Sequence, residues 1–134
     1  MLERDYIMRL ISELIAAMRR SIEKSEGERD PESAAYLLEQ AVGQATDLDS
    51  SVLLSLSPDS IASILQVSGT DPRVIEFIVR GLLLASSYHA EAGNPLEAEV
   101  RAAQAQALAE AYDLPGNWSD VTPEALEGFF EENS

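Results

Sequence analysis

Five of the six prolines directly follow a residue whose side chain can cap a helix, and this pattern divides most of the chain into helices. Such a side chain can accept a hydrogen bond from a free N–H of the first turn, and proline at the first helical position loses no donor that the helix needs. Two of the starts add a hydrophobic staple, Leu56 with Ile61 and Val121 with Leu126. The pattern predicts helix starts at Asp30-Pro31, Ser57-Pro58, Asp71-Pro72, Asn94-Pro95 and Thr122-Pro123.

The joint Gly93-Asn94-Pro95 predicts an antiparallel pair of helices over residues 71–112, around which the rest of the chain is expected to pack. Gly93 can take the left-handed conformation that ends a helix. Asn94 can cap the next helix, and Glu97 completes a capping box. The first helix of the pair is apolar over more than half its circumference, which is typical of a helix deep in a core.

Apolar periodicity elsewhere predicts four further helices and no strand. The first should run from about Leu2 to Lys24, with Arg9, Glu13, Arg19, Arg20 and Glu23 on its exposed side. A second, to about Asp47, should turn Ala34, Leu37, Leu38, Ala41 and Ala45 inward, and a short one from Ser57 to Val67 should use Ile61, Ile64 and Leu65. We therefore expect one all-α domain of about six helices: a hairpin over 2–47, a short helical bridge over 50–68, a hairpin over 71–113 and a C-terminal helix over 122–131.

Charge limits the partners that the chain can bind. The formal net charge of −15 repels phosphate backbones and anionic membranes, so we expect neither nucleic-acid nor membrane binding. The imbalance is uneven, because residues 1–29 hold six bases and six acids, whereas ten acids and one base follow from Ala90 onward. This acidic flank is explained by solvation, or else it attracts a basic partner.

The absence of cysteine removes disulfides and thiolate chemistry and fits a reducing cytosol. The charged start Glu3-Arg4-Asp5 lacks the apolar run of a signal peptide. The longest apolar run, within residues 74–85, is interrupted by Glu76 and Arg80, which are four residues apart and can pair on one helix face. We expect a cytoplasmic protein in which this helix lies in the core.

The sequence offers little for catalysis. His89 is the only histidine, so one chain cannot form a two-histidine metal or relay site. Near a helix C-terminus, His89 is expected to hydrogen-bond the last carbonyls and to interact with the helix dipole. No nucleophile elbow, phosphate-binding loop or calcium loop is present in the sequence. We therefore expect no enzyme activity, no metal and no cofactor.

Two parts of the sequence place their apolar residues alike. When Asp30-Pro31 is aligned with Asn94-Pro95, residues Leu10, Ile11, Leu14, Ile15 and Met18 fall on Val74, Ile75, Ile78, Val79 and Leu82. Ala34, Ala41 and Ala45 fall on Ala98, Ala105 and Ala109. Any two amphipathic helices match when their apolar faces are in phase, so this similarity is either incidental or the mark of two related hairpins, as in a degenerate repeat.

The hairpin over residues 71–112 resembles the helix pair of the tetratricopeptide repeat, over about 34 residues. Small residues stand where that repeat brings its helices together: Ser86, Gly93, Ala98, Ala102 and Ala105. Such side chains let two helix axes approach to about 8 Å. The departures are Leu82 in place of a large aromatic residue, His89 in place of tyrosine and Glu110 in place of the closing proline. The resemblance implies a right-handed array of helical hairpins.

Asp5-Tyr6-Ile7-Met8-Arg9-Leu10-Ile11 and Leu54-Ser55-Leu56-Ser57 also resemble an uncharacterised bacterial family of small acidic helical proteins, a domain of unknown function. This second resemblance implies the same helical fold and no activity.

In the tetratricopeptide register, Arg80, Leu83, Ser87 and Glu91 would line the surface that such repeats use for peptides. The leading hypothesis is therefore a protein–protein interaction module that binds a protein or peptide there. One alternative is a structural homodimer that buries Val52–Leu56 or Phe129–Phe130 between subunits. Another is a small-ligand binder or hydrolase.

Overall fold

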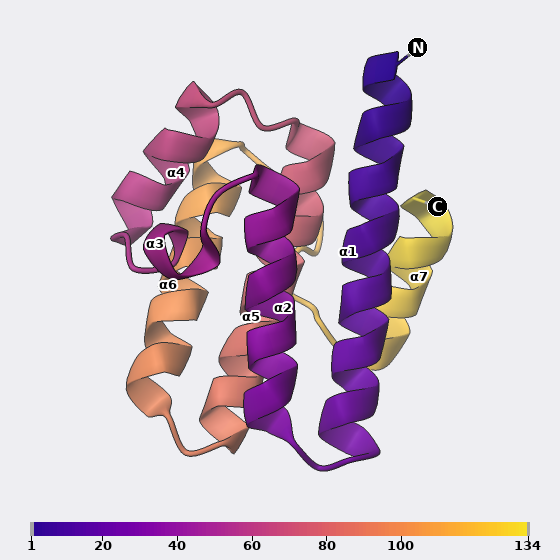
Figure 1. Ribbon diagram of the computed structural model, residues 1–134, viewed down its shortest axis with the longest axis vertical. Coiled ribbons are helices and arrows are strands. Elements are labelled where there is room, and N and C mark those ends of the chain that lie inside the picture. Colours follow the sequence, from indigo (N-terminus) through magenta and orange to yellow (C-terminus); the bar gives the residue numbers. More distant parts are fainter. Residues whose placement is uncertain (1, 134) are drawn as a thin grey trace.

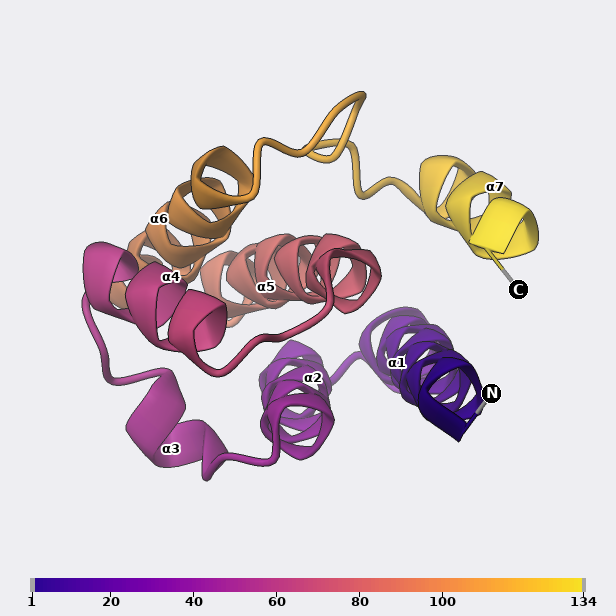
Figure 2. The same cartoon turned by 90° about the horizontal axis from the view of Figure 1, so that it is seen from above.

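The computed structural model describes residues 2–133, with side chains placed from Glu3 to Asn133. The described residues form seven α-helices and no strand, which confirms the all-α prediction (Figure 1). Two long antiparallel hairpins are joined by two short helices, and the last helix passes behind the first (Figure 1, Figure 2). The helices are α1 (Leu2–Glu26), α2 (Pro31–Thr46), α3 (Ser50–Leu53), α4 (Pro58–Val67), α5 (Pro72–Glu91), α6 (Pro95–Ala111) and α7 (Pro123–Asn133).

All five predicted helix starts are confirmed, because α2, α4, α5, α6 and α7 each begin at the proline of a capping pair. Four of the five expected side-chain caps also form, each accepting a hydrogen bond from an N–H two or three residues further on: Asp30, Ser57, Asp71 and Thr122.

The capping box predicted for α6 is wrong. Asn94 occupies the N-cap position, but its side chain makes no capping hydrogen bond. Its backbone N–H donates to the His89 carbonyl over 2.8 Å, which leaves no donor there for Glu97. The Glu97 carboxylate instead accepts from Arg101, one turn further along α6. The sharp turn depends on Gly93, whose φ of +85° lies in the left-handed region.

Helix α5 is the centre of the core, as its sequence predicts. It is buried over most of its circumference and contacts α1, α2 and α6. Figure 2 shows it enclosed, with α1 and α2 on one side and α6 and the segment leading to α7 on the other. One apolar cluster continues through α5 from Ile7 in α1 to Phe130 in α7.

The close contact between α5 and α6 is also confirmed. Ala98 and Ala105 are buried, Ala102 is half-buried, and the Ser86 hydroxyl donates to the Ala98 carbonyl over 2.6 Å. This hydrogen bond requires the two backbones to lie close together, because the serine side chain is short. Small residues at these positions therefore set the spacing of the hairpin.

Some expected core positions lie elsewhere. Leu37 and Ala41 of α2 are only half-buried, whereas Ala35 and Val42 are fully buried. Helix α2 contacts both α1 and α5, so its buried face is broader than one amphipathic stripe and is turned toward α5. Ile64 of α4 is 40% exposed, because α4 packs on α6 through the neighbouring turns and leaves Ile64 on the outer side.

None of the helices within residues 2–133 combines the length and the apolar character needed to cross a bilayer.

Candidate functional site

The structure does not bring the four predicted partner-binding residues together on one open surface. Arg80 is 7% exposed and Leu83 packs against the core, whereas Ser87 and Glu91 are exposed one and two turns further along α5. The four residues do share one side of α5. The covered part of that side lies beneath α7.

Arg80 is buried because an aromatic ring of α7 lies over it. The guanidinium carbon of Arg80 is 3.6 Å from the centroid of the Phe129 ring, and that ring is 4.6 Å from the ring of Phe77. The predicted Glu76–Arg80 ion pair is wrong, because Arg80 Nη1 donates to the backbone carbonyl of Glu76 over 2.9 Å. Burial lowers the pKa of Arg80. The cation is therefore held by a carbonyl and a π face.

Helix α7 is fixed by apolar burial and by one ion pair. Leu126 and Phe130 are fully buried, and Arg19 of α1 donates twice to the Glu127 carboxylate, over 2.9 and 3.1 Å. This hydrogen bonding raises the pKa of Arg19 and lowers that of Glu127. Arg19 also lies 5.2 Å from the Phe130 ring centroid. Phe130 is fully buried and Phe129 half-buried within their own chain, so the Phe129–Phe130 surface expected for a homodimer is largely covered by intramolecular packing.

We call the surface of α1 and α5 beneath α7 the α1–α5 face. It continues past the start of α7 into a hollow of about 160 Å³. Ser87, Glu91 and Ser25 line this open end, and the Ser25 hydroxyl donates to Glu91 over 3.3 Å. Two of the four predicted residues thus lie at the uncovered end of the face, and two lie in its covered part.

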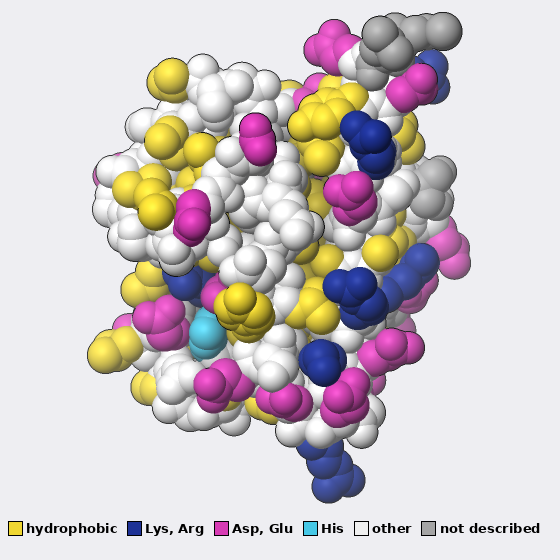
Figure 3. All heavy atoms as spheres, in the orientation of Figure 1, with side chains coloured by type: hydrophobic (Ala, Val, Ile, Leu, Met, Phe, Trp, Pro, Cys, Tyr) yellow, Lys and Arg dark blue, Asp and Glu magenta, His cyan; other side chains and the backbone are white. Residues whose placement is uncertain are grey.

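A second surface was not found from the sequence. Helices α2, α3 and α6 enclose an open groove of about 520 Å³, which we call the α2–α6 groove. A second hollow continues it along the C-terminal half of α2. Figure 3 views the molecule from this side, with the histidine, in cyan, visible between acidic and basic side chains. The groove is lined by Tyr36, Glu39, Gln40, Ser50, Ser51, Leu54, Ser55, Glu97, Val100 and Arg101.

The floor of the groove is a buried polar network centred on Arg101. Its Nε donates to Glu39 over 2.8 Å, and Nη1 donates to the Leu54 carbonyl and to Gln104, each over 3.1 Å. Gln104 in turn donates to the carbonyls of Leu54 and Leu56. We call these groups, with His89 and Glu97, the Arg101 network. It joins α2, α5 and α6 to the segment between α3 and α4.

His89 belongs to this network, so its predicted bonding to the last carbonyls of α5 is wrong. His89 Nε2 lies 2.7 Å from Glu39 Oε2 on α2, which fixes the ring across to the neighbouring helix. Its Nδ1 is enclosed and has no hydrogen-bond partner among residues 3–133.

The sequence held one signal for this network. Arg101 is the only base after Ala90, in an alanine-rich helix, and a lone charge on the inner side of such a helix needs a partner. Its partner Glu39 is 62 residues away, and only the packing of α2 beside α6 reveals the pair. Among the described residues, no group of three or more His, Asp or Glu side chains is placed to hold a metal ion.

No protein-family profile, curated protein sequence or solved structure matches this chain.

Proposed function

We propose that this protein is a tetratricopeptide-like interaction module that binds an extended segment of a partner protein in the α2–α6 groove. The observation that carries the proposal is the combination of an open groove with a rigid, hydrogen-bonded floor, the Arg101 network. Sites that hold a ligand in one orientation are built on supports of this kind.

The packing of the helices supports the tetratricopeptide-like part of the proposal. Helix α5 contacts both helices of the preceding hairpin as well as its own partner α6, as consecutive hairpins of a helical array do. The departure from a simple array is the insertion of α3 and α4 between the hairpins. This insertion is also what supplies one wall of the groove.

The groove lining supports a peptide as the ligand. Tyr36 and Val100 are 64% and 41% exposed on its two sides, so each can contact an apolar side chain without moving. Gln40 and Ser50 also line the groove; Gln40 Nε2 donates to the Ser50 hydroxyl over 2.7 Å, which leaves the Gln40 carbonyl oxygen and the Ser50 O–H to hydrogen-bond a peptide backbone. Exposed aromatic side chains beside small polar groups are typical of protein recognition surfaces.

Charge supports a basic partner segment. Glu97 is half-exposed at the groove, and the adjoining hollow adds Asp47 and Asp49. Arg101 lies at the floor, where its donors are directed to Glu39, Leu54, Glu97 and Gln104. The exposed rim is therefore acidic on a chain of formal charge −15, which favours and accelerates association with cationic segments.

The proposal is tested by quantitative affinity purification with three forms of the chain. Tyr36→Ser with Val100→Ser removes both apolar sides of the groove, whereas Val67→Ser removes an aliphatic residue of α4 that is 88% exposed and lies outside the groove. Proteins that are retained by the wild type and by Val67→Ser, but not by the double variant, would support partner binding in the groove. A direct measurement is the set of NMR shift changes caused by a ten-residue peptide containing arginine and leucine. Equal recovery by all three forms, or shift changes away from Tyr36 and Val100, would contradict the proposal.

A homodimer is the second candidate, on a surface other than those expected. Of the Val52–Leu56 segment, Leu53 and Leu54 are buried and Val52 is exposed. The outer side of α4 exposes Ile64 at 40% and Val67 at 88%, one turn apart. Sedimentation over a range of concentrations should reveal this dimer, and Val67→Glu should abolish it. Wild-type chain that stays monomeric at millimolar concentration would eliminate this candidate.

A further inference from the structure

Two cations of the α1–α5 face, Arg19 of α1 and Arg80 of α5, lie against the aromatic rings of α7. Six of the nine basic residues lie in residues 1–29, most of them on α1, and Arg80 of α5 adds another. Helix α7, which covers the face, carries four glutamates and no base. The face and its occupant therefore match in apolar surface and, at Arg19 and Glu127, in charge.

We propose that the α1–α5 face is a binding site for an acidic amphipathic helix of a partner protein, and that α7 is a tethered occupant which such a helix displaces. The site is distinct from the α2–α6 groove, which lies toward the other side of the molecule (Figure 1, Figure 2).

The contacts of α7 define what the face recognises. Leu126, Phe129 and Phe130 stand at positions i, i+3 and i+4 of one helix face, which is the spacing of helix-in-groove ligands. Glu127, at i+1, reaches Arg19. A partner helix therefore needs an aliphatic residue, two aromatic residues and a carboxylate in the order Leu-Glu-x-Phe-Phe.

Two features of the face remain unused by α7. Arg80 has the Phe129 ring over it but no carboxylate within 4.0 Å among the described residues, so a partner with an acid at this point gains a charge-assisted hydrogen bond. The open end at Ser87 and Glu91 gives a longer helix further surface. A partner can thus make contacts that α7 does not.

The attachment of α7 allows displacement. Helix α7 has only 11 residues, and isolated helices of that length are marginal in water, so it is stable mainly while it is docked. The segment 112–122 that leads to it contains no helix, so it can bend to release α7 while Leu114 and Trp118 stay packed against the core. Gly128 weakens the helix further, because glycine has a low helix propensity. No close contact requires a glycine there, since a Cβ would meet nothing within 4 Å.

The test uses a fluorescent peptide of residues 119–133 as the probe, added to the full chain. Tethered α7 competes with the probe, so wild type should bind it weakly. Phe130→Ala in the chain should raise the affinity at least about tenfold, because more of the population then has a free face. Glu127→Arg in the chain should do the same to a smaller degree and removes no core side chain. Gly128→Ala in the chain should lower the affinity about threefold to fivefold by strengthening α7.

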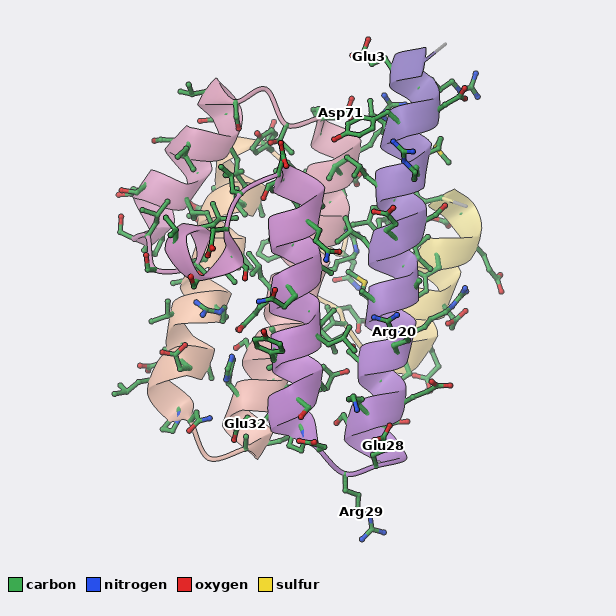
Figure 4. All side chains as sticks on the ribbon, viewed as in Figure 1. Glu3, Arg20, Glu28, Arg29, Glu32 and Asp71 are labelled. Atoms are coloured by element: carbon green, nitrogen blue, oxygen red, sulfur yellow. The ribbon has the colours of Figure 1, made fainter. Side chains whose placement is uncertain are left out.

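Register on the face is tested by exchanging charges. In the Phe130→Ala chain, Arg19→Glu should lower the affinity for the probe. A probe that carries Glu127→Arg should restore the affinity for this Arg19→Glu chain. Arg20→Glu is the matched control, because Arg20 lies on the side of α1 that faces the viewer in Figure 4, whereas α7 passes behind. Equal effects of Arg19→Glu and Arg20→Glu would overturn the proposal.

Two further results would also overturn it. One is a chain with Phe130→Ala or Glu127→Arg that keeps its far-UV circular dichroism but binds the probe no better than wild type. The other is a concentration-dependent dimer that Arg19→Glu abolishes, because the face would then accept α7 from a second copy of the chain and not a partner helix.

Discussion

Arg101 of α6 donates its Nε–H to the Glu39 carboxylate of α2 over 2.8 Å, and the same carboxylate oxygen lies 2.7 Å from His89 Nε2 of α5. One carboxylate thus ties together three helices from both hairpins. Its side chain is 15% exposed and that of Arg101 is 9% exposed. The pair therefore resembles a buried ion pair, in which the loss of one partner is more damaging than the loss of both.

Removing Arg101 alone should be severe. Arg101→Met leaves Glu39 buried without its cation, and we expect a loss of about 3–5 kcal/mol in the free energy of unfolding. Glu39→Gln should destabilise the wild type but stabilise the Arg101→Met chain, since it removes the uncompensated charge while an amide oxygen can still accept from His89. Urea denaturation of the four chains measures this double-mutant cycle. Additive effects of Arg101→Met and Glu39→Gln on the free energy of unfolding would contradict a direct interaction between the two side chains.

Gln104 should matter far more for stability than Gln106, two residues further along the same helix. Gln104 is fully buried and donates to the carbonyls of Leu54 and Leu56, whereas Gln106 is exposed and bonds Glu110. Gln104→Leu removes the side-chain donor to the Leu56 carbonyl, one of two donors to the Leu54 carbonyl and an acceptor for Arg101, and should lower stability by about 1–3 kcal/mol. Gln106→Leu should change it by no more than about 0.5 kcal/mol. Thermal or urea denaturation compares the two variants, and equal losses would contradict the assigned role of Gln104.

Two helical glycines should respond oppositely to alanine. A Cβ at Gly43 of α2 would lie 2.8 Å from the Ser50 Cβ and 2.9 Å from the Leu48 carbonyl oxygen, whereas a Cβ at Gly128 of α7 would meet nothing within 4 Å. Gly43→Ala should therefore destabilise the protein by about 1–3 kcal/mol through overpacking, despite its better helix propensity. Gly128→Ala should stabilise α7 by up to about 1 kcal/mol.

Urea midpoints for the two alanine variants measure these effects, and hydrogen exchange within α7 reports the second one locally. A stabilising Gly43→Ala would mean that α2 and the start of α3 lie further apart than the structure shows.

Asp71, the cap of α5, should make stability depend on pH. Hydrogen bonds from the Arg73 side chain, and then from its backbone N–H, lower the pKa of Asp71 below the ordinary 3.8. These hydrogen bonds favour the ionised Asp71 in the folded state. The stability that they contribute is therefore complete well above the pKa of Asp71 in the unfolded chain, and it is lost as the pH falls through the pKa in the folded chain. Wild type should thus exceed Asp71→Asn in stability at pH 7, by a margin that shrinks below about pH 4.

Urea denaturation between pH 7 and pH 3 measures this margin. In an Arg73→Ala background the same comparison should depend less on pH, because the main donor is gone. A margin that stays constant from pH 7 to pH 3 in the wild-type background would contradict the assignment.

The helix starts and the turn at Gly93 could be predicted from the sequence, because each depends on only a few neighbouring residues. Each proline fixes φ and forgoes a donor at the first helical position, so the starts of α2, α4, α5, α6 and α7 follow directly. The left-handed turn at Gly93 also follows, since glycine has no Cβ. Left-handed residues at Arg29, Asp47 and Asp113 did not follow, because side chains rarely favour that conformation and the flanking helices impose it.

The position of α7 could not be read in this way. Its apolar side predicts only that it packs against the body of the protein and does not indicate which helices it covers. Phe129 lies on Arg80 and Phe77, which are 49 and 52 residues earlier in the chain, and only the docking of α7 on α5 brings these side chains together. The predicted partner surface was therefore partly occupied by the chain itself.

The sequence by itself determined the helices, most of their caps and the small residues that let α5 and α6 pack closely, since these depend on backbone conformation and side-chain size. Only the tertiary structure decided which polar groups meet: Glu39 with Arg101 and His89, and Arg19 with Glu127. The physical reason is that a buried charge has to find its partner in space, and contacts between helices far apart in sequence depend on how every helix between them is packed.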